Sequence, residues 1–333
     1  MEYHGIRLSA RTRRSEPSWP TVIATTVRLW LQRHPLVGRK PTRRRPAALV
    51  IAAVCVLALG VGVAGAVLGS GTTSATAIVP QAAPAGSGAG ALGTSAATRA
   101  AAATWIAEQV ASSAIVACDP AMCAALEADG IPAGSLLVLG TSAADPLGSD
   151  VVVATAAVRS QFGARLASVY APSVIASFGS GVGRIEVRAV APDGAAAYKS
   201  DLAADRSSRI SAGAQLLRNK GIGVTAGARK ALSDGDVDPR LLMLLAALAG
   251  QQPVRVTAFG DPSPGASTAV PLRSAQLAPL HPGAKATSAL KSMLSFIEAQ
   301  QQPYQPLRAS LTGTSGLTVE YAAPSPLGLL GSP

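Results

Sequence analysis

The sequence predicts an α/β protein in which a single N-terminal transmembrane helix and a linker precede an extracytoplasmic layered α/β domain with a mixed sheet. Three observations predict this arrangement. Residues 46–69 form an apolar run without a charge, and residues 70–95 are rich in Gly, Ser, Ala and Pro. From residue 96 onward, short apolar strands alternate with helical patterns. We assign 96–262 to the α/β domain, and 263–333 to a Pro-rich connection, an amphipathic helix and a C-terminal hairpin packed on it.

The apolar run Ala47–Gly69 is long enough to cross a membrane, because a helix of this length spans roughly 35 Å and a hydrocarbon core is about 30 Å thick. Arg43, Arg44 and Arg45 directly precede the run, and the next Lys or Arg is Arg99. This asymmetry places the N-terminus in the cytoplasm and the large C-terminal part outside. The predicted location is therefore the cell membrane.

The positive charge of the chain belongs to its N-terminal tail. Residues 1–45 carry eleven Lys and Arg against two acids, whereas residues 46–333 carry eighteen against sixteen. A basic tail beside a membrane helix serves topology and contacts anionic lipid headgroups. We therefore expect the membrane as a partner of the tail and do not expect nucleic acid.

Two alternatives remain open for the apolar run. The small residues Ala75-Thr76-Ala77 offer a signal-peptidase site, and cleavage there would give a secreted protein. Gly65 and Gly69 have the GxxxG spacing that lets two membrane helices approach, which would give a homodimer.

The elements of the outer part follow from apolar periodicity and capping residues. Helices are predicted at 96–112, 119–130, 155–162, 193–220, 225–232, 239–250 and 285–302. Strands are predicted at 114–117, 136–139, 151–154, 184–191, 222–224 and 254–259, with a closing hairpin at 307–312 and 317–321. We expect 260–283 to be irregular and the last residues to be loose, apart from a leucine pair that can dock.

Cys118 and Cys123 are predicted to form a structural disulfide. Asp119 is a suitable N-cap and Pro120 suits the first helical position. In that frame the two cysteines occupy the N′ and N4 positions, which meet in a hydrophobic staple. The loop between them is short, so we expect about 2 kcal/mol of chain-entropy stabilisation at most.

Catalytic templates find little support outside the membrane segment. His281 stands alone in a Pro-rich loop, whereas a zinc site or a catalytic triad needs partners in reach. Ser288 and Lys291 match S-x-x-K, but the accompanying KTG motif is absent, and the simpler interpretation is an i,i+3 pair on an amphipathic helix. Folding can bring Asp145 and Asp150 together as paired carboxylates, although the sequence does not show it.

Two further patterns resemble ligand-binding loops and have simpler interpretations. Asp234, Asp236 and Asp238 begin like a calcium loop, but Pro and Leu occupy its sixth and twelfth positions, so helix capping is the better interpretation. The glycines of FGSGVGR (178–184) lack the lysine of a phosphate loop and predict a turn before a strand. We predict no catalytic, cofactor-binding or metal-binding residue and no cofactor.

The stretches WIAEQVASSAIVACDPAMCAALEADG, VVVATAAVRSQFG and DVDPRLLMLLAALAGQQPVRVTAFGD resemble a group of actinobacterial membrane-anchored or secreted envelope proteins. The resemblance implies no activity. We expect a non-enzymatic module that binds an envelope polymer or a partner protein. The alternatives are an envelope hydrolase with a Ser/Lys or paired-carboxylate site, and a transmembrane signalling protein whose basic tail docks a cytoplasmic partner.

Overall fold

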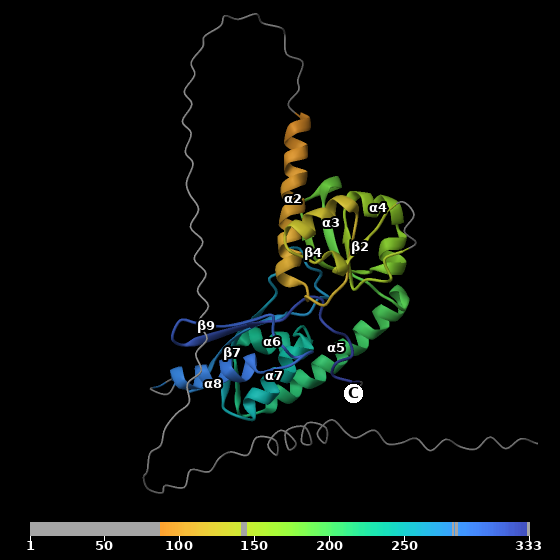
Figure 1. The fold of residues 1–333 in the computed structure, drawn as a ribbon. Coiled ribbons are helices and arrows are strands. Elements are labelled where there is room, and N and C mark those ends of the chain that lie inside the picture. The colour runs from red at the N-terminus through yellow and green to blue at the C-terminus, as the bar shows by residue number, and fades with distance from the viewer. Residues whose placement is uncertain (1–86, 141–144, 282, 284–285, 332–333) are drawn as a thin grey trace, which may run out of the picture. The chain divides into compact units, whose positions relative to one another are not determined.

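The computed structural model describes residues 87–331 apart from 141–144, 282 and 284–285 (Figure 1). The basic tail with Arg43–Arg45, the apolar run and the segment up to residue 86 lie outside the described residues. Among the helices that the structure describes, none is long and apolar enough to cross a membrane.

The first sheet has the strand order β2-β1-β3-β5-β4. β1 pairs in parallel with both β2 and β3, whereas β5 pairs in antiparallel with β3 and β4. The strands are β1 (Val116–Cys118), β2 (Leu136–Val138), β3 (Val151–Ala154), β4 (Ser173–Phe178) and β5 (Ile185–Ala189). The helical segments beside them are α2 (Ser87–Gln109), α3 (Pro120–Ala128), the 3₁₀ turn η1 (Ala133–Ser135), α4 (Ala156–Phe162), the π-turn η2 (Leu166–Tyr170) and the 3₁₀ turn η3 (Gly181–Gly183).

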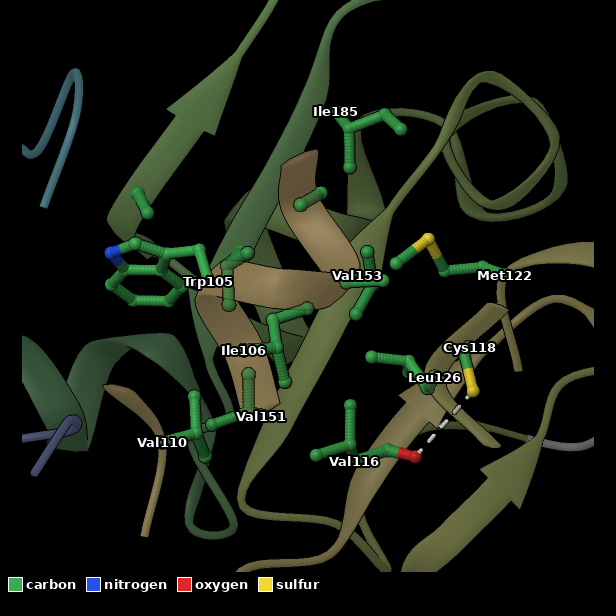
Figure 2. Close-up of a cluster of buried hydrophobic side chains, with 14 of the residues drawn as sticks. Trp105, Ile106, Val110, Val116, Cys118, Met122, Leu126, Val151, Val153 and Ile185 are labelled. Carbon is green, nitrogen blue, oxygen red and sulfur yellow. Dashed lines mark hydrogen bonds between the residues drawn. The ribbon is translucent and has the colours of Figure 1, made fainter. Parts of the chain in front are cut away.

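Both faces of this sheet are buried. Successive side chains of β3 point to opposite faces, and each face packs against helical segments. Val151 and Val153 pack with Ile106 of α2 and Leu126 of α3, and Figure 2 shows these side chains converging. Val152 packs on the other face in a second cluster that α4 and η2 complete. The first sheet is therefore the middle layer of three.

The second sheet has the order β6-β7-β8-β10-β9, with β6 and β7 parallel and the remaining neighbours antiparallel. Its strands are β6 (Ile222–Val224), β7 (Val254–Gly260), β8 (Ser274–Pro279), β9 (Arg308–Thr312) and β10 (Gly316–Glu320). Its helices are α5 (Gly194–Arg218), α6 (Ala226–Asp234), α7 (Pro239–Ala249) and α8 (Ala286–Glu298).

The second sheet has one buried and one open face. Val254, Val256, Leu277, Leu317 and Val319 alternate along β7, β8 and β10 and are all buried. The helices α6, α7 and α8 contact these strands. The intervening residues include Arg255, Thr257, Gln276 and Thr318, which are at least partly exposed, so the opposite face offers hydroxyl, amide and guanidinium groups to solvent.

Buried ion pairs attach the C-terminal segment 321–331 to this layer. Asp238 caps α7, accepts hydrogen bonds from Arg240 Nε (3.0 Å) and Nη2 (2.7 Å), and accepts another from Ser325 Oγ (2.5 Å). Arg240 also donates to the carbonyl of Ala322 (2.8 Å). Because both partners are buried, removing one leaves an unpaired charge inside the protein.

A second buried pair attaches the end of the same segment. Asp205 accepts from Arg209 Nε (2.7 Å) and from the backbone N–H of Gly328 (3.1 Å). Ser208 donates to the carbonyl of Gly331 (2.8 Å), and Leu330 is buried. The C-terminal segment, which we predicted to be loose, is therefore docked. Of the leucine pair, Leu330 is the buried member.

The structure confirms the α/β class but distributes the strands over two mixed sheets. The region 260–283, expected to be irregular, contains β8, a central strand that pairs with β7 and β10. The first described helix begins at Ser87, so it includes residues that we assigned to the linker. β4 was not predicted either, because the stretch before residue 178 was not assigned to a strand. The predicted elements agree with the observed ones to within a few residues.

Candidate functional site

A hollow of about 430 Å³ lies on the open face of the second sheet. Strands β7, β8 and β10 contribute most of its lining, and the β9–β10 turn closes one side. The polar side chains that line it are Arg255, Thr257, Gln276, Thr312, Ser315 and Thr318. Its volume lies in the range of small-molecule sites, which is about 300–1,000 Å³.

Strand alternation places Arg255 in the hollow. Val254 and Val256 are buried on the helix-covered face, so the residue between them must point to the other face. Arg255 is exposed, and in register it faces Ala278, a small residue that leaves room for the guanidinium. Arg255 is the only described lining residue with a charged side chain, and its backbone belongs to strand β7.

A β-bulge shapes the neighbouring wall. The register of β7 and β8 shifts between Val256 and Ala258, which leaves Thr257 as the extra residue. Thr257 Oγ1 donates to the carbonyl of Gln276 (3.1 Å), and the carbonyl of Thr257 accepts from Thr225 Oγ1 (2.9 Å). Two hydrogen bonds, one to the side chain and one to the carbonyl of Thr257, therefore hold the bulge in place next to Arg255.

The hairpin of β9 and β10 supplies the opposite wall. The Oγ1 atoms of Thr312 and Thr318 are 2.9 Å apart and share a hydrogen bond. Thr318 also faces Gln276 across the β8–β10 pair. Two hydroxyls and one carboxamide therefore lie on the same face as the guanidinium of Arg255.

The side chains of Arg255 and Gln276 make no hydrogen bond or ion pair with another residue that the structure describes. The described lining residues include one cation and no acid, so the hollow favours an anionic group. The guanidinium has its five donors available, and the carboxamide and hydroxyls can both donate and accept. This set suits binding of a carboxylate or phosphate on a polar ligand, and it offers no nucleophile with an adjacent base.

A second hollow, of about 470 Å³, has the opposite character. It lies between the first sheet, the start of α5 and the C-terminal segment, and its lining includes Asp150, Asp193 and Asp201. Asp150 accepts a hydrogen bond from the N–H of Ile115 (2.8 Å), and burial raises the pKa of the nearby Tyr198. Among the described residues, no group of three or more His, Cys, Asp or Glu is arranged to hold a metal ion.

The catalytic alternatives from the sequence do not meet in a site. Ser288 and Lys291 are both exposed on α8 and line neither hollow, and His281 is exposed in its loop. Asp145 accepts from the N–H of Leu147 (3.0 Å), whereas Asp150 is bound to Ile115, so each carboxylate serves a different backbone group.

The capping interpretations are confirmed. Asp238 caps α7, while Asp236 pairs with Arg206 (3.3 Å) and Asp234 pairs with Lys230. The glycines of 178–184 form the turn between β4 and β5.

The structure also contains the predicted disulfide. Cys118 and Cys123 are bonded, with their Cα atoms 5.4 Å apart, and both are buried. Asp119 accepts hydrogen bonds from the N–H groups of Ala121 (3.0 Å) and Met122 (3.1 Å), so it is the N-cap of α3. The bond therefore connects the N′ and N4 positions of this helix, as expected.

Arg255, Gln276 and the two threonines were not predicted from the sequence as site residues. A signal for β7 was present, because V-R-V-T alternates apolar and polar residues and puts Arg255 and Thr257 on the solvent side. Gln276 belongs to β8, one of the strands that were not predicted, so its neighbours could not be identified.

Comparison with protein-family models, with curated proteins and with solved structures finds no match to this chain. A function for the hollow is therefore inferred from its own residues.

Proposed function

We propose that this protein is a membrane-anchored, extracytoplasmic binding module that holds an anionic envelope component in the hollow around Arg255. The observation that carries the proposal is the guanidinium of Arg255, which has no partner among the residues that the structure describes and lies among hydroxyls and a carboxamide, with no acid in the described lining. The apolar run and its arginine flank support the location.

The ligand class follows from the lining. A carboxylate pairs with the planar fork of Arg255, and hydroxyl or amide groups of the ligand pair with Gln276, Thr312 and Thr318. No aromatic side chain lines the hollow in the described part of the chain, so a sugar ring has no face on which to stack. A carboxylate-bearing peptide or glycopeptide fragment of the cell wall fits this chemistry better than a neutral glycan.

The alternatives have less in their favour. A hydrolase of the Ser/Lys or paired-carboxylate type needs those groups side by side in a cleft, and the described positions of Ser288, Lys291, Asp145 and Asp150 do not offer that. A signalling role rests on the basic tail alone.

The proposal is tested by titrating the purified full-length chain in detergent with muramyl dipeptide, a soluble peptidoglycan fragment that carries a carboxylate, hydroxyls and amides. Arg255→Gln should weaken binding about tenfold to a hundredfold, since a hydrogen bond to a charged group is worth about 1.5–3 kcal/mol. Arg229→Gln, which removes an exposed arginine of α6, is the control and should not change the affinity. Equal affinities of wild type and Arg255→Gln, or no binding by wild type, would contradict the proposal for this ligand.

A further inference from the structure

The loop between β4 and β5 holds an apolar side chain out into solvent. Val182 at its tip is 90% exposed, more than any other large apolar residue described. Single exposed apolar residues are common on protein surfaces. What distinguishes Val182 is how firmly its loop is held and which charges surround it.

Arg159 of α4 holds the loop by its carbonyls. Its guanidinium donates to the carbonyl of Val182 (2.9 Å) and also to those of Arg184 and Ala154. Gly179 has a left-handed backbone (φ +67°), and a Cβ added there would meet Thr98 of α2 at 2.9 Å. The loop is thus fixed between α4 and α2, with Val182 directed outward.

The segment around the loop is basic. Arg159 donates to carbonyls of the loop and Arg184 stands at its end, and the one acid close to them in sequence is Glu186. Glu186 is buried between Arg184 (2.6 Å) and Arg188 (2.8 Å), while half of the Arg184 side chain remains exposed.

We infer that the β4–β5 loop docks on the anionic lipid surface of the membrane to which the chain is anchored, with Val182 entering the headgroup region. A rigid apolar tip flanked by arginines matches the way in which peripheral segments bind anionic lipid. Protein–protein interfaces are anchored by larger side chains such as Trp, Tyr and Arg, and a single valine does not provide such an anchor. The inference rests on the membrane anchor of the proposed function, but not on the ligand of the Arg255 hollow.

The position of the loop along the chain makes the contact reachable. The loop touches α2 at Thr98, eleven residues after the helix begins at Ser87, a distance of about 17 Å along the helix. Seventeen residues separate Gly69 from Ser87. Extended at about 3.5 Å per residue, they can span about 60 Å, which exceeds that distance several-fold.

The test uses the full-length chain with Cys55→Ala, so that an introduced cysteine is the sole reactive thiol beside the buried disulfide. An environment-sensitive dye is attached through Val182→Cys or, as the control, through Val138→Cys on the exposed edge of β2, and the protein is reconstituted into vesicles. With phosphatidylglycerol present, we expect a shorter emission wavelength and several-fold stronger quenching by spin-labelled lipid at position 182 than at position 138. Pure phosphatidylcholine vesicles, high salt or Arg184→Gln should reduce that difference.

Identical dye behaviour at the two positions, in a chain that still co-floats with the vesicles, would overturn the docking and leave the anchor intact. A chain that does not co-float would refute the anchor itself. A response at position 182 to soluble polyphosphate but not to lipid would also overturn the inference, because it would make the loop a binder of anionic polymer.

Discussion

Asp238→Asn is expected to destabilise the protein through a charge rather than through a lost cap. The substituted side chain keeps an oxygen that can accept from the N–H of Arg240, whereas the buried guanidinium of Arg240 loses its counter-charge. Breaking a buried ion pair costs about 3–5 kcal/mol. Arg240 still donates to the carbonyl of Ala322, and its Cζ lies 4.9 Å from the centroid of the Tyr321 ring. We therefore expect a loss of stability at the lower end of this range, about 3 kcal/mol.

Thermal unfolding of the full-length chain in detergent, followed by circular dichroism, should show this loss. For a domain of this size, about 3 kcal/mol lowers Tm by about 6–12 °C. Asp201→Asn on the exposed side of α5 is the matched control and should change stability by less than about 0.5 kcal/mol. The double variant Asp238→Asn/Arg240→Met should regain part of the loss, because it removes the unpaired charge. Equal effects of Asp238→Asn and Asp201→Asn would refute the reasoning.

Three further outcomes are expected. Replacing both Cys118 and Cys123 with Ser should cost about 2 kcal/mol in urea unfolding, because the loop that the disulfide closes is short; an unchanged midpoint would contradict this. Burial raises the pKa of Tyr321, so above pH 10 the unfolded chain loses that proton first and stability should fall by up to about 1.4 kcal/mol per pH unit; Tyr321→Phe should flatten this fall, and an equally steep fall in the variant would count against it. Trypsin added to intact protoplasts should leave a membrane fragment that contains the whole basic tail and ends at Arg99 or a later basic residue, because the tail is inside and no Lys or Arg lies between Arg45 and Arg99; full protection, or a soluble product that begins near Ile78, would exclude the proposed topology.

Local signals explain which parts of the fold the sequence predicts. Asp119 with Pro120 marks the start of α3, and Asp238 with Pro239 marks the start of α7, because capping is a property of a few adjacent residues. The strand β3 is visible because four apolar residues in a row indicate burial on both faces. The same local rule gives the Cys118–Cys123 bond.

The parts that were missed depend on distant contacts. β8, Ser-Ala-Gln-Leu-Ala-Pro, contains no β-branched or aromatic residue and lies in a Pro-rich region, and its pairing with β7 and β10 stabilises it in place of intrinsic propensity. The docking of the C-terminal segment depends on Asp205 and Asp238, which lie far away in sequence.

The site was beyond prediction for the same reason. Arg255 and Thr257 can be assigned to one face of a strand from their alternation with valines. Their proximity to Gln276, Thr312 and Thr318 requires the strand order β7-β8-β10-β9, in which the last strand in sequence lies inside the sheet. A central strand that is not recognised therefore hides the hollow as a whole.

Hydrogen exchange of the full-length chain, with and without muramyl dipeptide, tests the central claim most directly because it locates the ligand. The account predicts slower exchange confined to peptides that cover β7, β8 and the turn from Thr312 to Gly316, and loss of that protection in Arg255→Gln. Protection centred on the hollow around Asp150 and Asp193, or protection that survives Arg255→Gln, would contradict it.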